Sequence, residues 1–390
     1  MDLNAIQEKL LEEGFDGWLF FDHHHRDPIA YRVLGLEAGR HVSRRWYYWI
    51  PATGEPVKLT HRIEHWMLDA LPGAKVVYSG WREQRERLGE ILDDQMRIAM
   101  QYSPDCMIPY VSLVDAGTVE MVRELGKAVF SSASLVQAFE AVWSAEQLAM
   151  HEEAGRRVDA IRAAAFARIG DKLRAGETVR EHEVAQFILD QFAAQGLVTQ
   201  DGPIVGVNAN SGNPHYAPDP AGSAEIKAGD FVLIDLWAKL DKPKAVYYDI
   251  TWTGFCGETA PEKIRQVFDI VTRSRDAALE AVDKAMREGR QIAGWEVDDV
   301  TRGVITGAGY GEAFVHRTGH SIGENVHGNG VNIDNLETRD ERPIVPGVCF
   351  SIEPGIYLPE FGVRSEIDCF VLEGGAKATG EVQRELVRVL

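Results

Sequence analysis

Carboxylates inside apolar, strand-like runs restrict the fold of this chain more than any other feature. Asp235 lies within the run Phe231–Trp237, and Asp249 follows fourteen residues later within Val246–Thr253. A carboxylate in an apolar strand costs several kcal/mol unless a cation or hydrogen-bond donors satisfy it. For one such residue, an outward-facing position at a sheet edge is the simpler interpretation. The pair is different, because a hairpin connection at 239–243 would bring both carboxylates together.

A histidine-rich segment follows the pair of carboxylates. His316, His320 and His327 are spaced four and seven residues apart and make up three of the 12 histidines in the chain. Gly319 and Gly323 flank His320, and glycines let the backbone bend so that imidazole rings can converge. The segment is therefore a candidate source of metal ligands.

Two further carboxylates complete the candidate set. Glu353 ends the apolar run 348–352, and Glu366 precedes the apolar run 367–371. Four strand-borne carboxylates and one histidine form a ligand set made mostly of oxygen, which suits two divalent ions such as Mn²⁺, Co²⁺, Fe²⁺ or Zn²⁺. Two ions about 3.5 Å apart lower the pKa of a water held between them, which favours hydrolytic chemistry.

Composition excludes several other classes of function. The chain has 390 residues and a formal net charge of −19, which argues against a nucleic-acid partner. The longest apolar runs, such as Gly17–Phe21, are too short to span a membrane, and the first residues carry no secretory signal. Four scattered cysteines indicate reduced thiols, so we expect a cytoplasmic protein.

The pattern of helix and strand signals divides the chain near residue 140. The first part alternates strands and helices and predicts a small α/β domain over residues 1–140. Residues 141–390 predict an α+β domain, in which Ser144 and Thr178 open helices through capping boxes. The expected strands are 17–21, 45–51, 57–60, 75–78, 97–102, 231–237, 246–253, 348–352 and 367–372. The expected long helices are 144–169, ending at Gly170, then 178–196 and 261–289.

The ordered motifs resemble those of a known family. Asp235, Asp249, the Gly-His-x-x-Gly motif around His320, Glu353-Pro-Gly and Arg364-x-Glu occur in the order seen in the pita-bread metallopeptidases. That family includes methionine aminopeptidase, aminopeptidase P, prolidase and creatinase. The resemblance implies a pita-bread fold, with helices packed on a curved antiparallel sheet, over 141–390. The first 140 residues resemble, more loosely, the amino-terminal domain of the creatinase and prolidase branch. Methionine aminopeptidases lack that domain, which favours the prolidase and aminopeptidase P branch.

The resemblance also implies roles for the metal-ligating residues. Asp235 matches the bidentate ligand of one metal ion, and Asp249 and Glu366 match the carboxylates that bridge both ions. His320 and Glu353 match the ligands that complete the other site. Glu353 is also similar to the family residue that transfers a proton from the bridging water.

Four other residues match catalytic positions of the family. His215 matches a histidine that contacts the substrate, and His327 matches a histidine near the scissile carbonyl. His316 matches an additional histidine of the proline-specific enzymes. Arg364 matches an arginine that supports the ligands.

The activity that the resemblance implies is that of an Xaa-Pro dipeptidase similar to prolidase. It would hydrolyse the bond before proline in short peptides through a metal-bridging hydroxide. We expect two divalent metal ions, manganese first, with zinc, cobalt or iron as alternatives, and a homodimer. One alternative is an Xaa-Pro aminopeptidase similar to aminopeptidase P, acting on longer peptides. Others are a metal-dependent lyase or non-peptide hydrolase on the same fold, and a non-catalytic binding module.

Three departures from the family pattern bear on the substrate. Trp237 replaces the usual glycine after the first ligand, and Trp252 replaces the usual arginine after the second. We expect the two tryptophans to make the pocket narrower or more apolar. The segment after His327 lacks the arginine that often holds the carboxylate of a dipeptide, which weakens the dipeptidase interpretation. A partner subunit could supply that cation, for which Arg40, Arg44 and Arg45 are candidates on charge alone.

The run His23–His25 is a separate feature of the amino-terminal domain. Adjacent residues on a strand point to opposite faces, so three consecutive histidines do not easily converge on one ion. We therefore expect a solvated loop or a pocket wall there.

Overall fold

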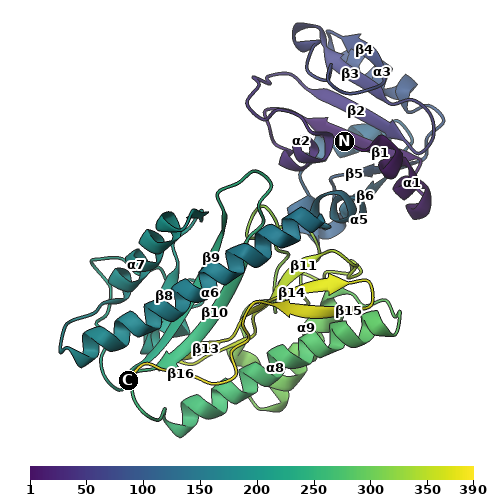
Figure 1. Cartoon of the computed structure of the whole chain (residues 1–390). Helices are drawn as coiled ribbons and strands as arrows, with labels where there is room; N and C mark the ends of the chain where they lie inside the picture. The colour runs from purple at the N-terminus through teal and green to yellow at the C-terminus, as the bar shows by residue number, and fades with distance from the viewer. The chain divides into compact units, whose positions relative to one another are not determined.

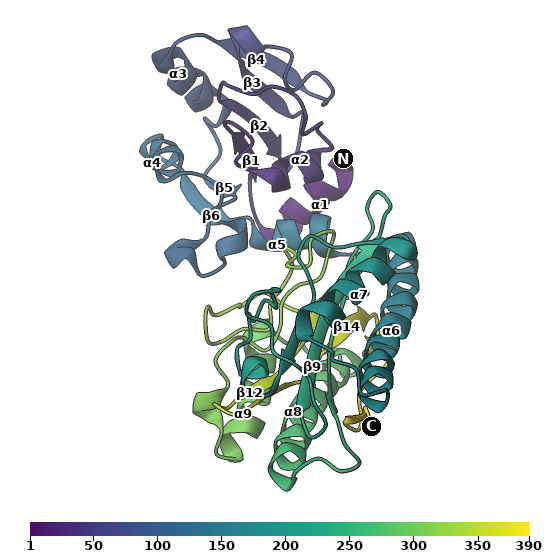
Figure 2. The same cartoon turned by 90° about the vertical axis from the view of Figure 1, so that its left-hand side faces the viewer.

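The computed structural model describes all 390 residues, which form two compact units, Met1–Glu140 and Ala141–Leu390 (Figures 1 and 2). Each unit has buried apolar clusters of its own. No helix in the chain is both long enough and apolar enough to cross a membrane.

Unit 1 is built on a six-stranded mixed sheet in the order β4-β3-β2-β1-β5-β6. Every residue of β1 and β2 is buried, because helices cover the sheet, which explains why both strands are continuous apolar runs. The strands are β1 (Gly17–Asp22), β2 (Trp46–Pro51), β3 (Val57–His61), β4 (Ala74–Tyr78), β5 (Arg97–Met100) and β6 (Ala128–Ser131). The helices are α1 (Leu3–Glu13), α2 (Pro28–Leu34), α3 (Trp81–Ile91), α4 (Ala116–Glu124) and α5 (Ala133–Val136).

Unit 2 is built around the long antiparallel pair β9 and β10. This pair joins β7, β8 and β16, while β11-β14-β15 form a second sheet and β12-β13 a ribbon. All of these pairings are antiparallel except that of β10 with β16. The strands are β7 (Leu197–Val198), β8 (Ile204–Val207), β9 (Phe231–Leu240), β10 (Tyr248–Phe255), β11 (Cys349–Ile352), β12 (Gly355–Tyr357), β13 (Gly362–Arg364), β14 (Ile367–Leu372), β15 (Gly375–Thr379) and β16 (Val387–Arg388).

Long helices cover these sheets. In Figure 1, α6 crosses the β9–β10 pair and α8 runs along β15, and the residue contacts agree. The apolar residues of α6 pack onto β9 and β10, whereas α9 packs on α8. The helices are α6 (Ala145–Arg174), α7 (Glu181–Ala194), α8 (Glu262–Arg287) and α9 (Gly294–Gly307).

Two of the predicted helix boundaries are wrong. The helix expected to end at Gly170 continues to Arg174, and Gly170 is buried inside it. A Cβ at this position would overlap the carbonyl oxygen of Val389, so this glycine serves close packing instead of ending the helix.

The capping box expected at Thr178 does not form, and the N-cap of α7 is Arg180, whose side chain makes no capping hydrogen bond. Glu183 accepts from the backbone N–H of Arg180, and α7 begins at Glu181. Glu181 itself is fully buried and accepts hydrogen bonds from the loops around it. Its donors are Val207 N, Asn210 Nδ2, Tyr216 Oη and Ala224 N, at 2.7 to 3.0 Å.

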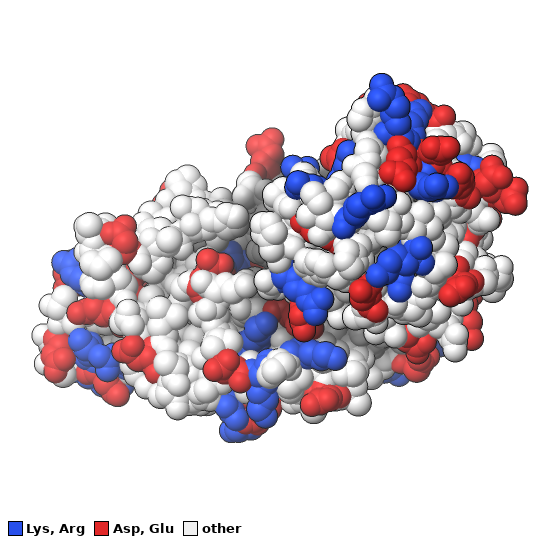
Figure 3. All heavy atoms as spheres, turned by 90° about the horizontal axis from the view of Figure 1, so that it is seen from above, with Lys and Arg blue, Asp and Glu red and all other residues white.

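Charged side chains of both signs are interspersed over the face drawn in Figure 3. No single acidic patch gathers on that face.

Candidate metal centre

The strand pair β9–β10 carries the first two predicted ligands on one face. Thr251 lies opposite Asp235, and Trp237 lies opposite Asp249. Directly paired residues of an antiparallel sheet point to the same side, and so do residues two apart on one strand. Asp235 and Asp249 therefore face the same side of the sheet, as a hairpin between the two strands predicts.

Segments from the second sheet bring the other predicted ligands to this face. His320 lies on a stretch beside β11, where its backbone N–H donates to the Ser351 hydroxyl at 2.9 Å. Glu353 directly follows β11, and its N–H donates to the carbonyl oxygen of Thr318 at 2.7 Å. Glu366 lies between β13 and β14 and accepts from the Thr251 hydroxyl at 2.7 Å. Hydrogen bonds to neighbouring segments therefore hold each of these ligands in place.

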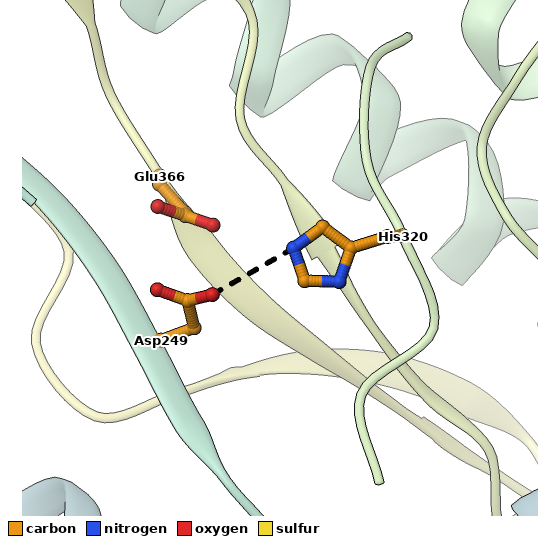
Figure 4. A group of neighbouring side chains, drawn as sticks. All are labelled: Asp249, His320 and Glu366. Carbon is orange, nitrogen blue, oxygen red and sulfur yellow. Dashed lines mark ion pairs between the residues drawn. The ribbon is translucent and has the colours of Figure 1, made fainter. Parts of the chain in front are cut away.

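The side chains converge as Figure 4 shows for three of them. One ligand atom each from Asp249, His320 and Glu366 lies within 4.8 Å of the others. His320 Nε2 is 3.6 Å from Asp249 Oδ2 and 3.4 Å from Glu353 Oε1. Asp235 lies close enough for its charge to act on the other three carboxylates. The structure thus brings together all five residues predicted as ligands.

The charge of this cluster is not balanced within the protein. Asp235, Asp249 and Glu366 are buried, and burial raises the pKa of each carboxyl above its usual value. Arg364 pairs with Asp235 and lies near Glu353, and the charge of Arg317 also acts on Glu353. One oxygen of Asp235 and one of Asp249 are buried without any hydrogen-bond partner. Buried carboxylates with vacant oxygens and too little positive charge fit divalent cations.

The tautomer of His320 also suits a metal ligand. Its Nδ1 lies 3.2 Å from the carbonyl oxygen of Ser321, which can only accept, so Nδ1 carries the proton. Nε2 then directs its lone pair toward Asp249 and Glu353. Burial lowers the pKa of His320 well below 6.5, which keeps the ring neutral.

Arg364 contacts two of the ligand carboxylates. Its guanidinium pairs with Asp235 and donates to the Thr251 hydroxyl at 3.0 Å and to Tyr357 Oη at 3.1 Å. It also lies 3.9 Å from Glu353. It therefore fixes carboxylates from two different sheets relative to each other.

His316 lies next to Tyr357, outside the group of ligand side chains. Its Nδ1 donates to the carbonyl oxygen of Arg317 at 2.6 Å, so Nε2 accepts from Tyr357 Oη at 2.7 Å. Burial lowers the pKa of His316 to about 3, and the nearby Arg364 adds to this shift. His316 thus reaches the cluster through Tyr357 and Arg364.

The other two predicted histidines lie at the edge of the cluster. The ring of His327 contacts the ring of His320 edge-on, with centroids 4.3 Å apart. His215 is exposed on the loop after β8, and its charge acts on both Asp235 and His327. Both residues are therefore placed where a substrate could reach them.

The expectation that both tryptophans narrow the pocket is wrong for Trp252. It neighbours Thr251 on β10 and so points to the opposite face, where Arg162 stacks on its ring at 3.4 Å. Trp237 lies opposite Asp249 and shares its face, and its buried indole N–H has no partner. One tryptophan, not two, borders the cluster.

Three supporting residues were not predicted. Thr251, Ser351 and Tyr357 link the carboxylates, His320, His316 and Arg364 through their hydroxyl groups. Asp368 is a fourth, since its buried carboxylate accepts from Asp249 N at 2.8 Å. Its place two residues after Glu366, again inside an apolar strand, is the one signal in the sequence that pointed to it.

Comparisons with known proteins agree with this arrangement. Residues 149–373 match the model of metallopeptidase family M24. The chain is 34% identical over 220 residues to an Xaa-Pro dipeptidase of Lactobacillus helveticus, covering 55% of this chain and 54% of that protein. It is 32% identical over 215 residues to an Xaa-Pro dipeptidase of Pyrococcus furiosus, covering 54% and 56%. The chain thus spans about half the length of the curated relatives it matches.

A solved structure extends the likeness of the fold to the whole chain. Dipeptidase PepE from Mycobacterium ulcerans superposes with a TM-score of 0.73 at 24% identity, covering 99% of this chain and 96% of that one. At this identity the likeness concerns the fold alone. It confirms the predicted fold class, an α+β pita-bread domain preceded by a smaller α/β domain.

Proposed function

Since the chain belongs to metallopeptidase family M24, we propose that it is a dinuclear-metal Xaa-Pro dipeptidase similar to prolidase. The observation that carries this proposal is the buried cluster of four carboxylates and one neutral histidine, which the guanidinium groups of Arg364 and Arg317 do not neutralise. We further propose that 1–140 is a creatinase-like amino-terminal domain and that 141–390 is the catalytic domain. The two compact units support this division.

The proposed ligands are the five residues of the cluster. Asp235 would hold one ion, His320 and Glu353 the other, and Asp249 and Glu366 would bridge both. When bound, the two ions supply an activated water and polarise the scissile carbonyl. Manganese is our first choice of metal, with zinc, cobalt or iron as alternatives, because oxygen-rich sites discriminate weakly among these ions.

The surrounding residues would orient the substrate and move protons. Glu353 is the proposed proton carrier, because burial raises its pKa to about 7, close to the operating pH that suits a general base. His327 and His215 border the cluster and would contact the peptide near the scissile bond. Arg364 would hold Asp235 and Glu353 in place, and His316 would do so through Tyr357.

Arg317 is our candidate for the cation that binds the carboxylate of a dipeptide. Its charge lowers the pKa of Glu353 and of His327, so it lies within electrostatic reach of the substrate side of the cluster. The guanidinium group is suited to bidentate recognition of a carboxylate. Arg317 would replace the arginine that is missing after His327.

An Xaa-Pro aminopeptidase acting on longer peptides is the second candidate. The absence of an arginine in the segment after His327 favours it. The alternative of a lyase or non-peptide hydrolase has less support, because one of its two motivating tryptophans, Trp252, faces away from the cluster.

We also propose a cytoplasmic location and a homodimer. The location is supported by four cysteines that are all free thiols. The dimer rests on the family resemblance.

The test compares an Xaa-Pro dipeptide with an Xaa-Pro-Yaa tripeptide on the manganese-loaded protein. We expect faster hydrolysis of the dipeptide, a loss of 10²- to 10⁴-fold (roughly) in Glu353→Gln, and no turnover after chelation. Faster hydrolysis of the tripeptide would favour the aminopeptidase. Metal binding without turnover of either peptide would overturn the peptidase proposal.

A further inference from the structure

The amino-terminal unit contains a cavity of about 640 Å³ that plays no part in the proposed peptidase chemistry. The loop after β1, the residues that precede β2 and the first residues of α3 and α4 form its walls. Small-molecule sites in proteins have volumes of about 300–1,000 Å³. The cavity is therefore large enough for a small molecule.

Positive charge dominates the lining. Arg26, Arg44 and Arg45 line the cavity, and Asp115 is the one carboxylate among the lining residues. Asp115 is already engaged, since it accepts from the N–H and the hydroxyl of Thr118 at 2.9 and 2.8 Å and caps α4. Three guanidinium groups against one carboxylate leave a formal charge of +2.

Two of these guanidinium groups have no anionic partner in the protein. Arg26 makes its hydrogen bond through its backbone N–H, and the side-chain partner of Arg45 is the neutral phenol of Tyr78, which also lines the cavity. Both lie close enough to His23 for their charges, together with burial of the ring, to lower the pKa of that histidine. Cations that lack an anionic partner and converge on one cavity are typical of an anion site.

The loop that carries part of this lining is held in a strained conformation. His24 and His25 have φ values of 62° and 57°, in the left-handed region that residues with a Cβ rarely adopt. The buried carboxylate of Asp22 holds the turn by accepting three backbone N–H groups at 2.7 to 3.1 Å. The turn presents His23 and Arg26 to the cavity. Strain of this kind persists where the surrounding structure fixes a functional geometry.

We propose that this cavity binds a small molecule that carries a phosphate dianion. A dianion would balance the formal charge of +2, whereas a monocarboxylate would leave one positive charge uncompensated. Guanidinium groups bind phosphate oxygens through paired, charge-assisted hydrogen bonds. Trp81, which is 62% exposed at the rim, offers a flat apolar face for the organic part of the ligand.

The first experiment titrates the chelated full-length protein with inorganic phosphate, phenyl phosphate and acetate at constant ionic strength and pH 7.5, by calorimetry. We expect one phosphate per chain, with acetate bound about tenfold more weakly or worse. Tighter binding of phenyl phosphate would identify an organic ester as the ligand, and equal binding would identify inorganic phosphate. Chelation removes peptidase activity, so the outcome is independent of the proposed function.

Variants test whether Arg26 and Arg45 form the site. Arg26→Gln and Arg45→Gln should each weaken phosphate binding about tenfold, the effect of one charge-assisted hydrogen bond. Arg87→Gln is the matched control, because Arg87 pairs with Glu90 on the surface of α3 and does not line the cavity. Equal phosphate affinity in all three variants would overturn the proposal, as would acetate binding as tightly as phosphate.

Thermal unfolding gives a second measurement that does not depend on calorimetry. Without phosphate, Arg45→Gln should melt close to the wild-type temperature, since it removes a cation that has no anionic partner together with one contact to the Tyr78 hydroxyl. Phosphate should raise the melting temperature of the wild type and of Arg87→Gln, but not that of Arg45→Gln. A phosphate-induced rise of equal size in Arg45→Gln would contradict the proposal.

Discussion

Glu353 is the residue whose protonation depends most directly on its surroundings. Burial raises its pKa to about 7 in the protein without metal, Arg364 opposes the shift, and Asp235 adds to it. The folded chain therefore keeps a proton that the unfolded chain releases above its ordinary pKa of 4.5. Hence this group's contribution to the free energy of unfolding falls as the pH rises from 4.5 through about 7.

Glu353→Gln removes this dependence. We subtract the free energy of unfolding of the wild type from that of the variant, both measured by urea denaturation with a chelator. This difference should be larger at pH 8 than at pH 5.5 by roughly 1 kcal/mol or more. Glu360→Gln, at an exposed carboxylate of the same segment, is the control and should show no such change. The same stability difference at both pH values would contradict the assigned pKa.

A second prediction at this scale concerns Arg317. If its guanidinium binds the carboxylate of the substrate, Arg317→Gln should raise KM for an Xaa-Pro dipeptide about tenfold and change kcat little. KM for the corresponding dipeptide amide should not change. Arg339→Gln, at a surface arginine paired with Glu341, serves as the control. An equal effect on the dipeptide and its amide would exclude the proposed contact.

Individual residues could be predicted from the sequence where their chemistry conflicts with their neighbours. Asp235 and Glu366 stand out because carboxylates are expensive inside apolar strands. Thr251 and Tyr357 did not stand out, since hydroxyl-bearing and aromatic residues are ordinary in strands. Their roles depend on contacts between β10, β12 and β13, which no local pattern encodes.

At the scale of elements, the stretch that carries His320 depends on close contact with β11. A Cβ on Gly319 would overlap the carbonyl oxygen of Ser351. Gly319→Ala should therefore displace His320, lower the melting temperature and weaken manganese binding at least about tenfold, measured by calorimetry. Gly303→Ala is the matched control, because this exposed glycine of α9 has open space around it.

The control variant Gly303→Ala should change the melting temperature in the opposite direction. Alanine is favoured over glycine inside a helix by about 0.5–1 kcal/mol, so Gly303→Ala should raise the melting temperature slightly and leave metal binding unchanged. Wild-type manganese affinity in Gly319→Ala would show that β11 does not position His320.

Most long elements could be predicted, and the failures have physical causes. Strands β1 and β2 are largely apolar runs because both of their faces are buried, so the sequence predicts them readily. The end of α6 was misplaced at Gly170, because a glycine required for close packing looks the same in sequence as one that ends a helix. The orientation of Trp252 was missed because it depends on the register between β9 and β10.

At the scale of the whole molecule, metal removal should affect the two units differently. Chelation would leave four carboxylates with the guanidinium groups of Arg364 and Arg317 as the cations near them. We expect hydrogen exchange to accelerate in β9, β10 and β14 and to stay unchanged in β1, β2 and β5. Mass spectrometry of peptic fragments, with and without chelator, measures the exchange rates in both groups of strands. Equal acceleration in the two units would contradict a metal centre confined to unit 2.

The proposed ligands are spread along unit 2, from Asp235 on β9 to Glu366 before β14. They meet only when these distant segments have folded together. Ions held there would join these parts much as a covalent cross-link does, and only in the folded chain. At 100 times their dissociation constant, they would add about 2.7 kcal/mol to its stability. The supply of free divalent ions would then govern how long the protein survives proteolysis in a cell, as well as whether it is active.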